Sequence, residues 1–216
     1  MTQVENTNLK VMSVTQIARQ LENWHTLSMD FPEMVQFPPG PPKRAAVLVP
    51  LQKKDDGWHI LFIRRAHRRG DHHSGQVAFP GGKVELDDHS VESAALRETW
   101  EEIGLHPSNV DLVGRLQNLV TITNFVVTPL VGIVKDPFDA VLSETEVARV
   151  FTMPLHWLAN PNNHILPGIN APAEVEVPKY GRVVKSEYFA PYDDEVLWGA
   201  TARMAFHLIK LLQKPL

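Results

Sequence analysis

Cysteine is absent from this 216-residue sequence. Its absence excludes disulfide bonds and thiolate metal sites, and it fits a reducing compartment. The sequence also lacks any stretch near the ~18 apolar residues that a membrane-spanning helix requires, and its first residues, MTQVENTNLK, lack the apolar run of a signal peptide. We therefore expect a cytoplasmic protein with no membrane span.

An excess of positive charge is missing too. The formal net charge is −4 at pH 7, which gives no reason to expect nucleic acid as a partner. Hydrophobic residues make up 44% of the chain, enough for the core of one domain of ordinary size. The prolines are unevenly placed, because residues 32–42 hold five of them. Such a stretch cannot continue a helix or enter a sheet interior, so we predict a stiff connector there.

The chain divides into an N-terminal segment, residues 1–43, and a main domain, residues 44–216. In the N-terminal segment, Val14, Ile17 and Leu21 recur at helical spacing and predict a short amphipathic helix within residues 13–27. Its apolar face could pack onto the core or into a homodimer.

Strands alternate with turns and helices through the main domain. We predict a β-hairpin from residues 45–51 and 58–63, and a closing helix at residues 200–213 with Met204, Leu208 and Leu211 on its apolar stripe. Further strands are predicted at residues 110–123, 124–135, 187–189 and 196–199, and a short helix after Pro154. Within the second of these, Thr128 and Pro129 predict a bend or a sheet edge.

The most informative stretch is residues 79–105, in which a Pro-Gly-Gly turn and an acidic loop precede a helix. Ser90 is a candidate N-cap, and Gly104 stands where the helix should end. Four residues at spacings of three and four share one helical face that can pack inward. They are Ser93, Leu96, Trp100 and Ile103.

A different face of the same helix carries Glu98, Glu101 and Glu102. Three carboxylates on one face repel each other unless a positive charge lies between them. A solvated acidic face is one explanation, but these residues occupy the last two turns, where the helix dipole opposes negative charge. The preceding glycines let backbone carbonyls approach a ligand closely. Carboxylate and carbonyl oxygens together indicate a site for Mg²⁺ or Mn²⁺.

This stretch resembles the Nudix box, the signature of hydrolases that split diphosphates attached to another group. The family pattern is G-x5-E-x7-R-E-U-x-E-E-x-G-U, where U is a bulky aliphatic residue, and Gly82 and the run RETWEEIGL from Arg97 onward carry the likeness. Asp88 replaces the first Glu, eight residues separate it from Arg97, and Thr99 fills the first aliphatic slot. The longer loop with Asp resembles that of one subgroup, the coenzyme A pyrophosphatases.

Residues 64–75, RRAHRRGDHHSG, are strongly basic and could form a solvated loop. Together with the following FPGG, they also resemble a segment that coenzyme A pyrophosphatases carry upstream of the box. One extra residue leaves the second arginine of that pattern open, with Arg69 first and Arg68 next. Arginine forks match phosphate oxygens. The substrate-binding residues that the resemblance implies are Arg64, Arg65, Arg69, Gly75, Phe79 and Gly81.

The resemblance implies a Nudix-type α/β/α sandwich with a mixed sheet, preceded by the N-terminal helix and connector. It implies Mg²⁺- or Mn²⁺-dependent hydrolysis of coenzyme A or acyl-coenzyme A to 3′,5′-ADP and 4′-phosphopantetheine or its acyl form. The alternatives are another nucleoside diphosphate derivative, such as ADP-ribose, a nucleotide sugar or a nucleotide, and a non-catalytic module that senses a nucleotide.

Each site residue has an expected role. Glu98, Glu101 and Glu102 are the catalytic metal ligands together with the carbonyl of Gly82, and Arg97 orients Glu101 one turn on. Glu146 is a candidate further ligand by position, with Glu144 behind it, although either could instead be a charge at a helix N-terminus. The expected partner is a small-molecule diphosphate.

Overall fold

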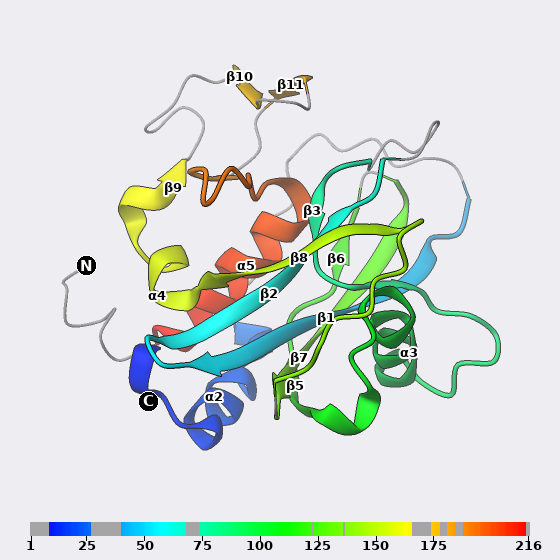
Figure 1. The fold of residues 1–216 in the computed structure, drawn as a ribbon, viewed down its shortest axis with the longest axis horizontal. Helices are drawn as coiled ribbons and strands as arrows, with labels where there is room; N and C mark the ends of the chain where they lie inside the picture. The colour runs from blue at the N-terminus through cyan, green and yellow to red at the C-terminus, as the bar shows by residue number, and fades with distance from the viewer. Residues whose placement is uncertain are drawn as a thin grey trace.

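The computed structural model describes residues 9–26, 40–67, 74–121, 123–135, 137–165, 174–177, 181–184 and 188–214. Within these residues, eight strands form one mixed sheet with the order β3-β2-β1-β7-β5, to which β8 adds beside β2, β4 beside β1 and β6 beside β7 (Figure 1). The strands are β1 Lys43–Lys54, β2 Gly57–Arg65, β3 Val77–Ala78, β4 Gly81–Lys83, β5 Val110–Arg115, β6 Leu119–Val120, β7 Phe125–Val134 and β8 Val147–Pro154.

Helices and two small strand pairs surround this sheet in the described part of the chain. The helices are α2 Val14–Leu21, α3 Val91–Ile103, α4 Leu155–Leu158 and α5 Gly199–Leu212. The strand pairs are β9 His164–Ile165 with β12 Tyr188–Phe189, and β10 Glu174–Val177 with β11 Gly181–Val184. No helix among the described residues is both long enough and apolar enough to span a membrane.

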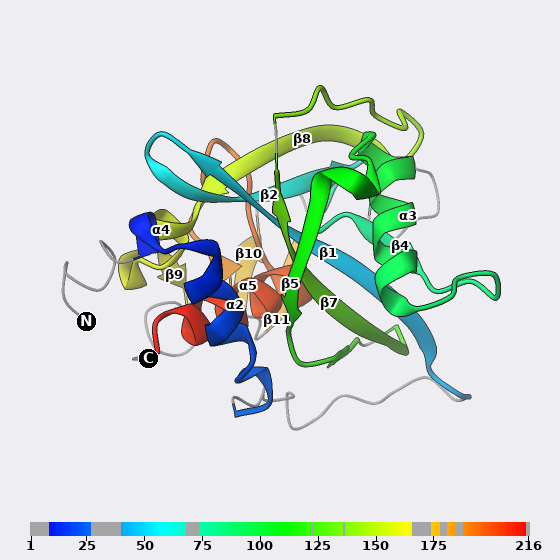
Figure 2. The same ribbon diagram turned by 90° about the horizontal axis from the view of Figure 1, so that it is seen from below.

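Alternation along β1 and β2 builds two layers of core, one on each face of the sheet. Ala46 packs with alanines of α3 on one face. Val49 and Phe62 pack with residues of α2 and α5 on the other. Figures 1 and 2 show α3 on one side of the sheet and α2, α4 and α5 on the opposite side. The predicted α/β/α sandwich with a mixed sheet is therefore confirmed.

Strands β1 and β2 diverge, and the short strands β3 and β4 fill the space between them. The β1–β2 register ends at Leu51 opposite Ile60, while β4 pairs with β1 further back, at residues 45–47. The N–H of Leu48 donates to the carbonyl of Pro80, at 2.9 Å, between the two pairings. This arrangement carries Gly81 and Gly82 along β1, directly beside α3.

The N-terminal helix belongs to the same core. Ser13 caps α2 in a capping box, and the side chains of Ile17 and Leu21 are buried among residues of α5. In the closing helix α5, the predicted stripe of Met204, Leu208 and Leu211 is buried as well. Most of the predicted connector lies outside the described residues, and the domain boundary near residue 43 stays a prediction.

Two expectations about strands are wrong. Pro129 lies inside β7, between β1 and β5, and not at a bend or sheet edge. Its missing N–H faces the side of β5, which ends at Arg115, and its carbonyl still accepts from the N–H of Leu116 at 2.9 Å. The ladder therefore loses little there. Residues 196–199 form only an isolated bridge, because Gly199 turns the chain with φ +62° into α5.

Candidate functional site

The helix α3 begins and ends where its sequence predicts. The Oγ of Ser90 accepts from the N–H of Ser93 at 3.1 Å, and the N–H of Ser90 donates to the Oγ of Ser93 at 2.9 Å. This reciprocal pair satisfies N–H groups that have no partner inside the helix. At the other end, Gly104 adopts the left-handed conformation with φ +73°.

The inward face of α3 differs from the predicted one. Trp100 is 51% exposed and packs edge-on against His106, so its predicted inward orientation is wrong. The small residues Ala94 and Ala95 face the sheet and are fully buried, since α3 lies against β1 and β4. The hydroxyl of Thr99 donates to the carbonyl of Ala95 at 2.7 Å, which explains how a polar residue fits the buried aliphatic slot.

Because the alanine face of α3 packs against the sheet, the side chain of Glu102 points into the protein. Its side chain is 3% exposed, and its carboxylate accepts from the N–H of Gly81 at 2.9 Å. Burial raises the pKa of Glu102 to about 7, and the negative charges of Glu98 and Glu146 add to the rise. The Gly81 hydrogen bond and the positive charge of Arg65 oppose it. With two negative neighbours and one positive neighbour, this buried carboxylate lacks a full counter-charge.

Glu98 lies against the backbone of Gly82. A Cβ at Gly82 would stand 2.5 Å from the Cδ of Glu98, so a side chain at this position would displace the carboxylate from its place beside β4. Burial raises the pKa of Glu98, and the charges of Glu101 and Glu146 raise it further against the opposing effect of Arg97. The charge of Glu146 therefore acts on both Glu98 and Glu102, and Glu146 lies in the turn before β8 and not at a helix N-terminus. Its role as a ligand stays a prediction.

Arg97 connects the acidic loop to the helix. Its Nε and Nη2 donate to the two oxygens of Asp88 at 3.0 and 2.9 Å, and its Nη1 donates to Glu98 at 3.1 Å and to Glu101 at 3.0 Å. The contact with Glu101 is the predicted one. The hydrogen bonds from Arg97 hold the pKa of Asp88 below its usual value. Asp88 was not among the predicted site residues, although it occupies the Glu slot of the box.

Strand alternation separates the first two arginines of the basic segment. Arg64 pairs in register with Arg149 of β8, and both donate to the buried Glu195, with 2.9 Å from the Nε of Arg64 and 3.2 Å from the Nη1 of Arg149. Arg65 points to the other face, where its charge acts on Glu102. The substrate role of Arg64 stays a prediction, and its guanidinium is held by Glu195 in this structure.

The remaining predicted substrate residues have mixed outcomes. The ring of Phe79 is 3% exposed and stacks on Phe62 in the core, and its predicted contact with substrate stays a prediction. The N–H of Gly75 donates to the carbonyl of Arg65 at 3.1 Å, in a turn with φ +69°. Gly81 orients Glu102 through its N–H. Arg69 lies outside the described residues.

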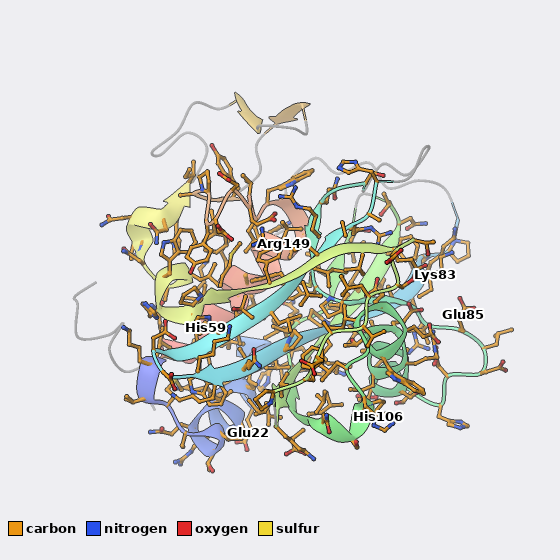
Figure 3. All side chains as sticks on the ribbon, in the orientation of Figure 1. Glu22, His59, Lys83, Glu85, His106 and Arg149 are labelled. Carbon is orange, nitrogen blue, oxygen red and sulfur yellow. The ribbon has the colours of Figure 1, made fainter. Side chains whose placement is uncertain are left out.

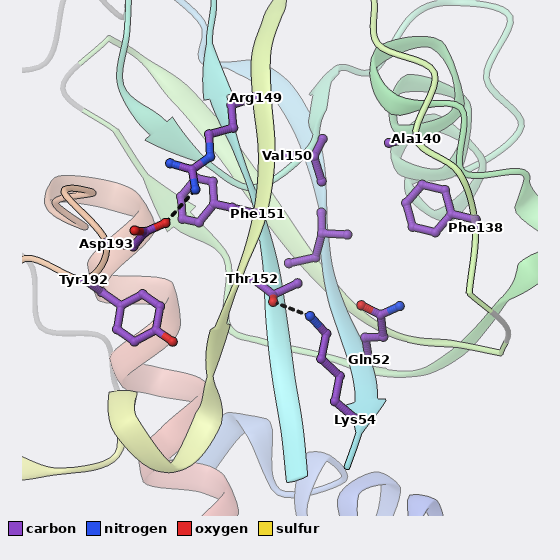
Figure 4. Close-up of a pocket in the computed structure, with 11 residues that line it drawn as sticks. Gln52, Lys54, Phe138, Ala140, Arg149, Val150, Phe151, Thr152, Tyr192 and Asp193 are labelled. Atoms are coloured by element: carbon purple, nitrogen blue, oxygen red, sulfur yellow. Dashed lines mark hydrogen bonds and ion pairs between the residues drawn. The ribbon is translucent and has the colours of Figure 1, made fainter. Parts of the chain in front are cut away.

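A hollow of about 590 Å³ lies beside β8, and none of the residues that line it belongs to α3 (Figure 4). Its cations are already engaged, because Arg149 pairs with Asp193 and Glu195, and Lys54 donates to Thr152 at 2.7 Å. Figure 3 shows Arg149 near the middle of the sheet and well apart from Lys83 and Glu85, which lie on the segment leading into α3. We therefore place the candidate site at α3 and not in the hollow.

The donor set at α3 fits a hard divalent cation. Glu98, Glu101, Glu102 and Glu146 offer carboxylate oxygens beside the backbone of Gly82, and the buried Glu102 and the half-buried Glu98 both have raised pKa values that a cation would lower. Among the described residues, no three Asp, Glu or His side chains are yet gathered closely enough to hold an ion. Arg97 instead occupies oxygens of Glu98 and Glu101.

The fold and this carboxylate helix are those of the Nudix class, and comparison with known proteins agrees. The family model for the NUDIX domain matches residues 41–175. The chain therefore belongs to the Nudix hydrolase family, whose members act on diphosphate-containing substrates and generally use divalent metal ions.

The similar curated proteins include several named uncharacterized Nudix hydrolase NudL. The one from Yersinia pestis (strain Pestoides F) is 34% identical over 166 residues, which cover 77% of this chain and 78% of that protein. The one from Enterobacter sp. (strain 638) is 45% identical over 113 residues, which cover 52% of this chain and 58% of that protein. The chain thus spans little more than half of the Enterobacter relative.

Among the solved structures that resemble this chain, sequence identity is low. A MutT/nudix family protein from Enterococcus faecalis is 18% identical, with a TM-score of 0.45 over 98% of this chain and 73% of that one. An Ap4A hydrolase from C. elegans is 21% identical, with a TM-score of 0.45 over 51% of this chain and 80% of that one.

Proposed function

We propose that this protein hydrolyses the diphosphate of coenzyme A or acyl-coenzyme A to 3′,5′-ADP and 4′-phosphopantetheine or its acyl form, with Mg²⁺ or Mn²⁺. The observation that carries the proposal is the position of Arg65, which lies on the face of β2 where its charge acts on Glu102. The basic segment that resembles the coenzyme A pyrophosphatases thus begins at the predicted metal ligands. A diphosphate there would contact both.

The chain's own residues divide the work. Glu98, Glu101, Glu102 and Glu146, with the carbonyl of Gly82, would hold the cation. When bound, a divalent cation supplies neutralising charge for the diphosphate and lowers the pKa of a water ligand. Arg65 binds phosphate oxygens, and Glu98 is placed to take the proton of the attacking water. That water adds its oxygen to one phosphorus, the P–O bond of the diphosphate breaks, and the leaving phosphate departs as an anion.

A panel of diphosphates tests the proposal. Purified protein with Mg²⁺ or Mn²⁺ is incubated with coenzyme A, ADP-ribose, a nucleotide sugar and a nucleoside triphosphate, and products are separated by chromatography. We expect 3′,5′-ADP and 4′-phosphopantetheine from coenzyme A at the highest kcat/KM. A higher kcat/KM for another substrate would establish the alternative, a hydrolase of a different nucleoside diphosphate derivative. No turnover of any substrate would favour a nucleotide-sensing module, which all three retained helix glutamates argue against.

Replacing Arg65 with alanine should lower kcat/KM by about 10- to 150-fold, the value of one charge-assisted hydrogen bond. Because the charge of Arg65 acts on Glu102, we expect Arg65 to bind the diphosphate that coenzyme A and dephospho-coenzyme A share. The replacement should therefore lower kcat/KM equally for both substrates. The control is Arg19→Ala, an exposed arginine of α2. If kcat/KM falls only for coenzyme A, Arg65 binds the 3′-phosphate, and Arg69 loses that predicted role.

The cytoplasmic location and a homodimer stay predictions that belong to this proposal. Size-exclusion chromatography with light scattering measures the second of them directly.

A further inference from the structure

The carboxylate of Asp88 is the most enclosed acid in the loop before α3. Its side chain is 5% exposed, although neighbouring Asp87 is exposed. Besides the two hydrogen bonds from Arg97, it accepts from the N–H of Glu85 at 2.8 Å. The N–H of Asp88 donates in turn to the carbonyl of Glu85 at 3.2 Å. Asp88 is therefore fixed by its own loop and presents both oxygens to one guanidinium.

This fork determines how much of Arg97 reaches the predicted metal ligands. Asp88 engages Nε and Nη2, so only Nη1 is left for Glu98 and Glu101. Each of these two glutamates gives Nη1 one oxygen. The negative charge of Asp88 offsets part of the positive charge of Arg97 that would otherwise act on Glu98 and Glu101. Without Asp88, the guanidinium would compete more strongly with a cation for the carboxylates of Glu98 and Glu101, which it already contacts.

We propose that Asp88 is a positioning residue that sets the cation affinity of the site by holding Arg97 partly away from Glu98 and Glu101. The inference rests on the proposed metal site and goes beyond it, since Asp88 acts through Arg97 and contacts no ion itself. Asp88 lies two residues before the N-cap Ser90, and from this position in the loop its carboxylate pairs with Arg97 of the helix.

Mn²⁺ binding by the full-length protein, followed by the electron paramagnetic resonance signal of free Mn²⁺, tests the proposal without any substrate. Asp88→Asn should raise the Kd by roughly tenfold, the scale of one unmatched charge near a divalent ion. Asp88→Glu, which keeps the charge, should stay within about threefold of wild type. The matched control Asp87→Asn removes the same charge from an exposed neighbour and should leave the Kd unchanged.

The decisive comparison uses Arg97→Met. If Asp88 acts through Arg97, Asp88→Asn should not weaken Mn²⁺ binding further when Arg97 is already methionine. A loss of equal size in both backgrounds, or an equal loss in Asp87→Asn, overturns the proposal. So does an Asp88→Asn Kd equal to that of wild type.

Two other results of these measurements also bear on the proposal. Should Asp88→Asn fail to fold, Arg97→Lys replaces it, because lysine keeps the charge but cannot form the fork, and it should weaken Mn²⁺ binding by a similar factor. Undiminished binding in Arg97→Lys would count against the proposal. If the wild-type protein itself binds no Mn²⁺, the proposed metal-dependent function fails first, and the role of Asp88 fails with it.

Discussion

Replacing Glu102 with glutamine is expected to lower kcat by about 100-fold, equal to about 2.7 kcal/mol of transition-state stabilisation. Glutamine keeps the size of the side chain and its acceptor for the N–H of Gly81, but it removes the charge that a hard cation requires. The measurement is steady-state turnover of coenzyme A at saturating Mg²⁺, together with circular dichroism to establish that the fold is kept.

The matched control for this variant is Glu92→Gln, which makes the same change in the first turn of the same helix. It should cost at most a few tenths of a kcal/mol in stability through the helix dipole and leave kcat unchanged. Wild-type turnover by Glu102→Gln would remove Glu102 from the metal site, and a loss shared equally with Glu92→Gln would indicate damage to the helix.

Replacing Gly81 with alanine should have the largest effect on stability, a loss of about 3 kcal/mol or more. Gly81 has φ +142°, which side chains rarely adopt, and a Cβ there would stand 2.4 Å from the carbonyl oxygen of Ala46 and 2.6 Å from the Cα of Val47. Both are backbone atoms of β1, so the sheet itself would have to move. Urea unfolding measures the loss.

Gly40→Ala separates the clash from the backbone strain. Gly40 also has positive φ, +110°, but a Cβ there would meet nothing within 4 Å. Its replacement should lower the free energy of unfolding only through backbone strain, by about 1–2 kcal/mol. Equal losses in the two variants would show that the close approach of β4 to β1 contributes nothing.

Local signals allowed helix α3 to be predicted from the sequence. The N-cap at Ser90 and the stop at Gly104 each depend on the chemistry of one residue and its near neighbours, and both are confirmed. The orientation of the helix does not depend on its sequence alone. Spacing grouped Trp100 with inward residues, but the sheet accepts the smaller alanine face, and Trp100 remains at the surface.

The contacts around the arginines show a second limit. The opposite directions of Arg64 and Arg65 follow from strand alternation and could have been predicted, since adjacent strand residues face opposite sides. The partner of Arg64 could not, because Glu195 lies 131 residues away in sequence. Only the completed fold, with the turn before α5 placed against β2 and β8, brings that carboxylate to Arg64 and Arg149.

The most direct test of the metal site compares the stability of the protein with and without Mg²⁺ as pH changes. Folding raises the pKa of Glu102 from 4.5 to about 7, so between these values the folded state binds more protons than the unfolded state. Without metal, this group's contribution is therefore present at low pH and lost as pH rises toward 7, by about 3 kcal/mol in total. A cation binds the ionised carboxylate, so Mg²⁺ should restore the stability that is lost as pH rises.

We predict that Mg²⁺ raises the Tm of the wild-type protein much more at pH 8 than at pH 5.5. We also predict that, without metal at pH 8, Glu102→Gln has a higher Tm than wild type. In this variant Mg²⁺ should raise the Tm much less than it does in wild type. A Mg²⁺-induced rise in Tm that is equal in wild type and Glu102→Gln at both pH values would contradict the central claim that Glu102 binds the cation.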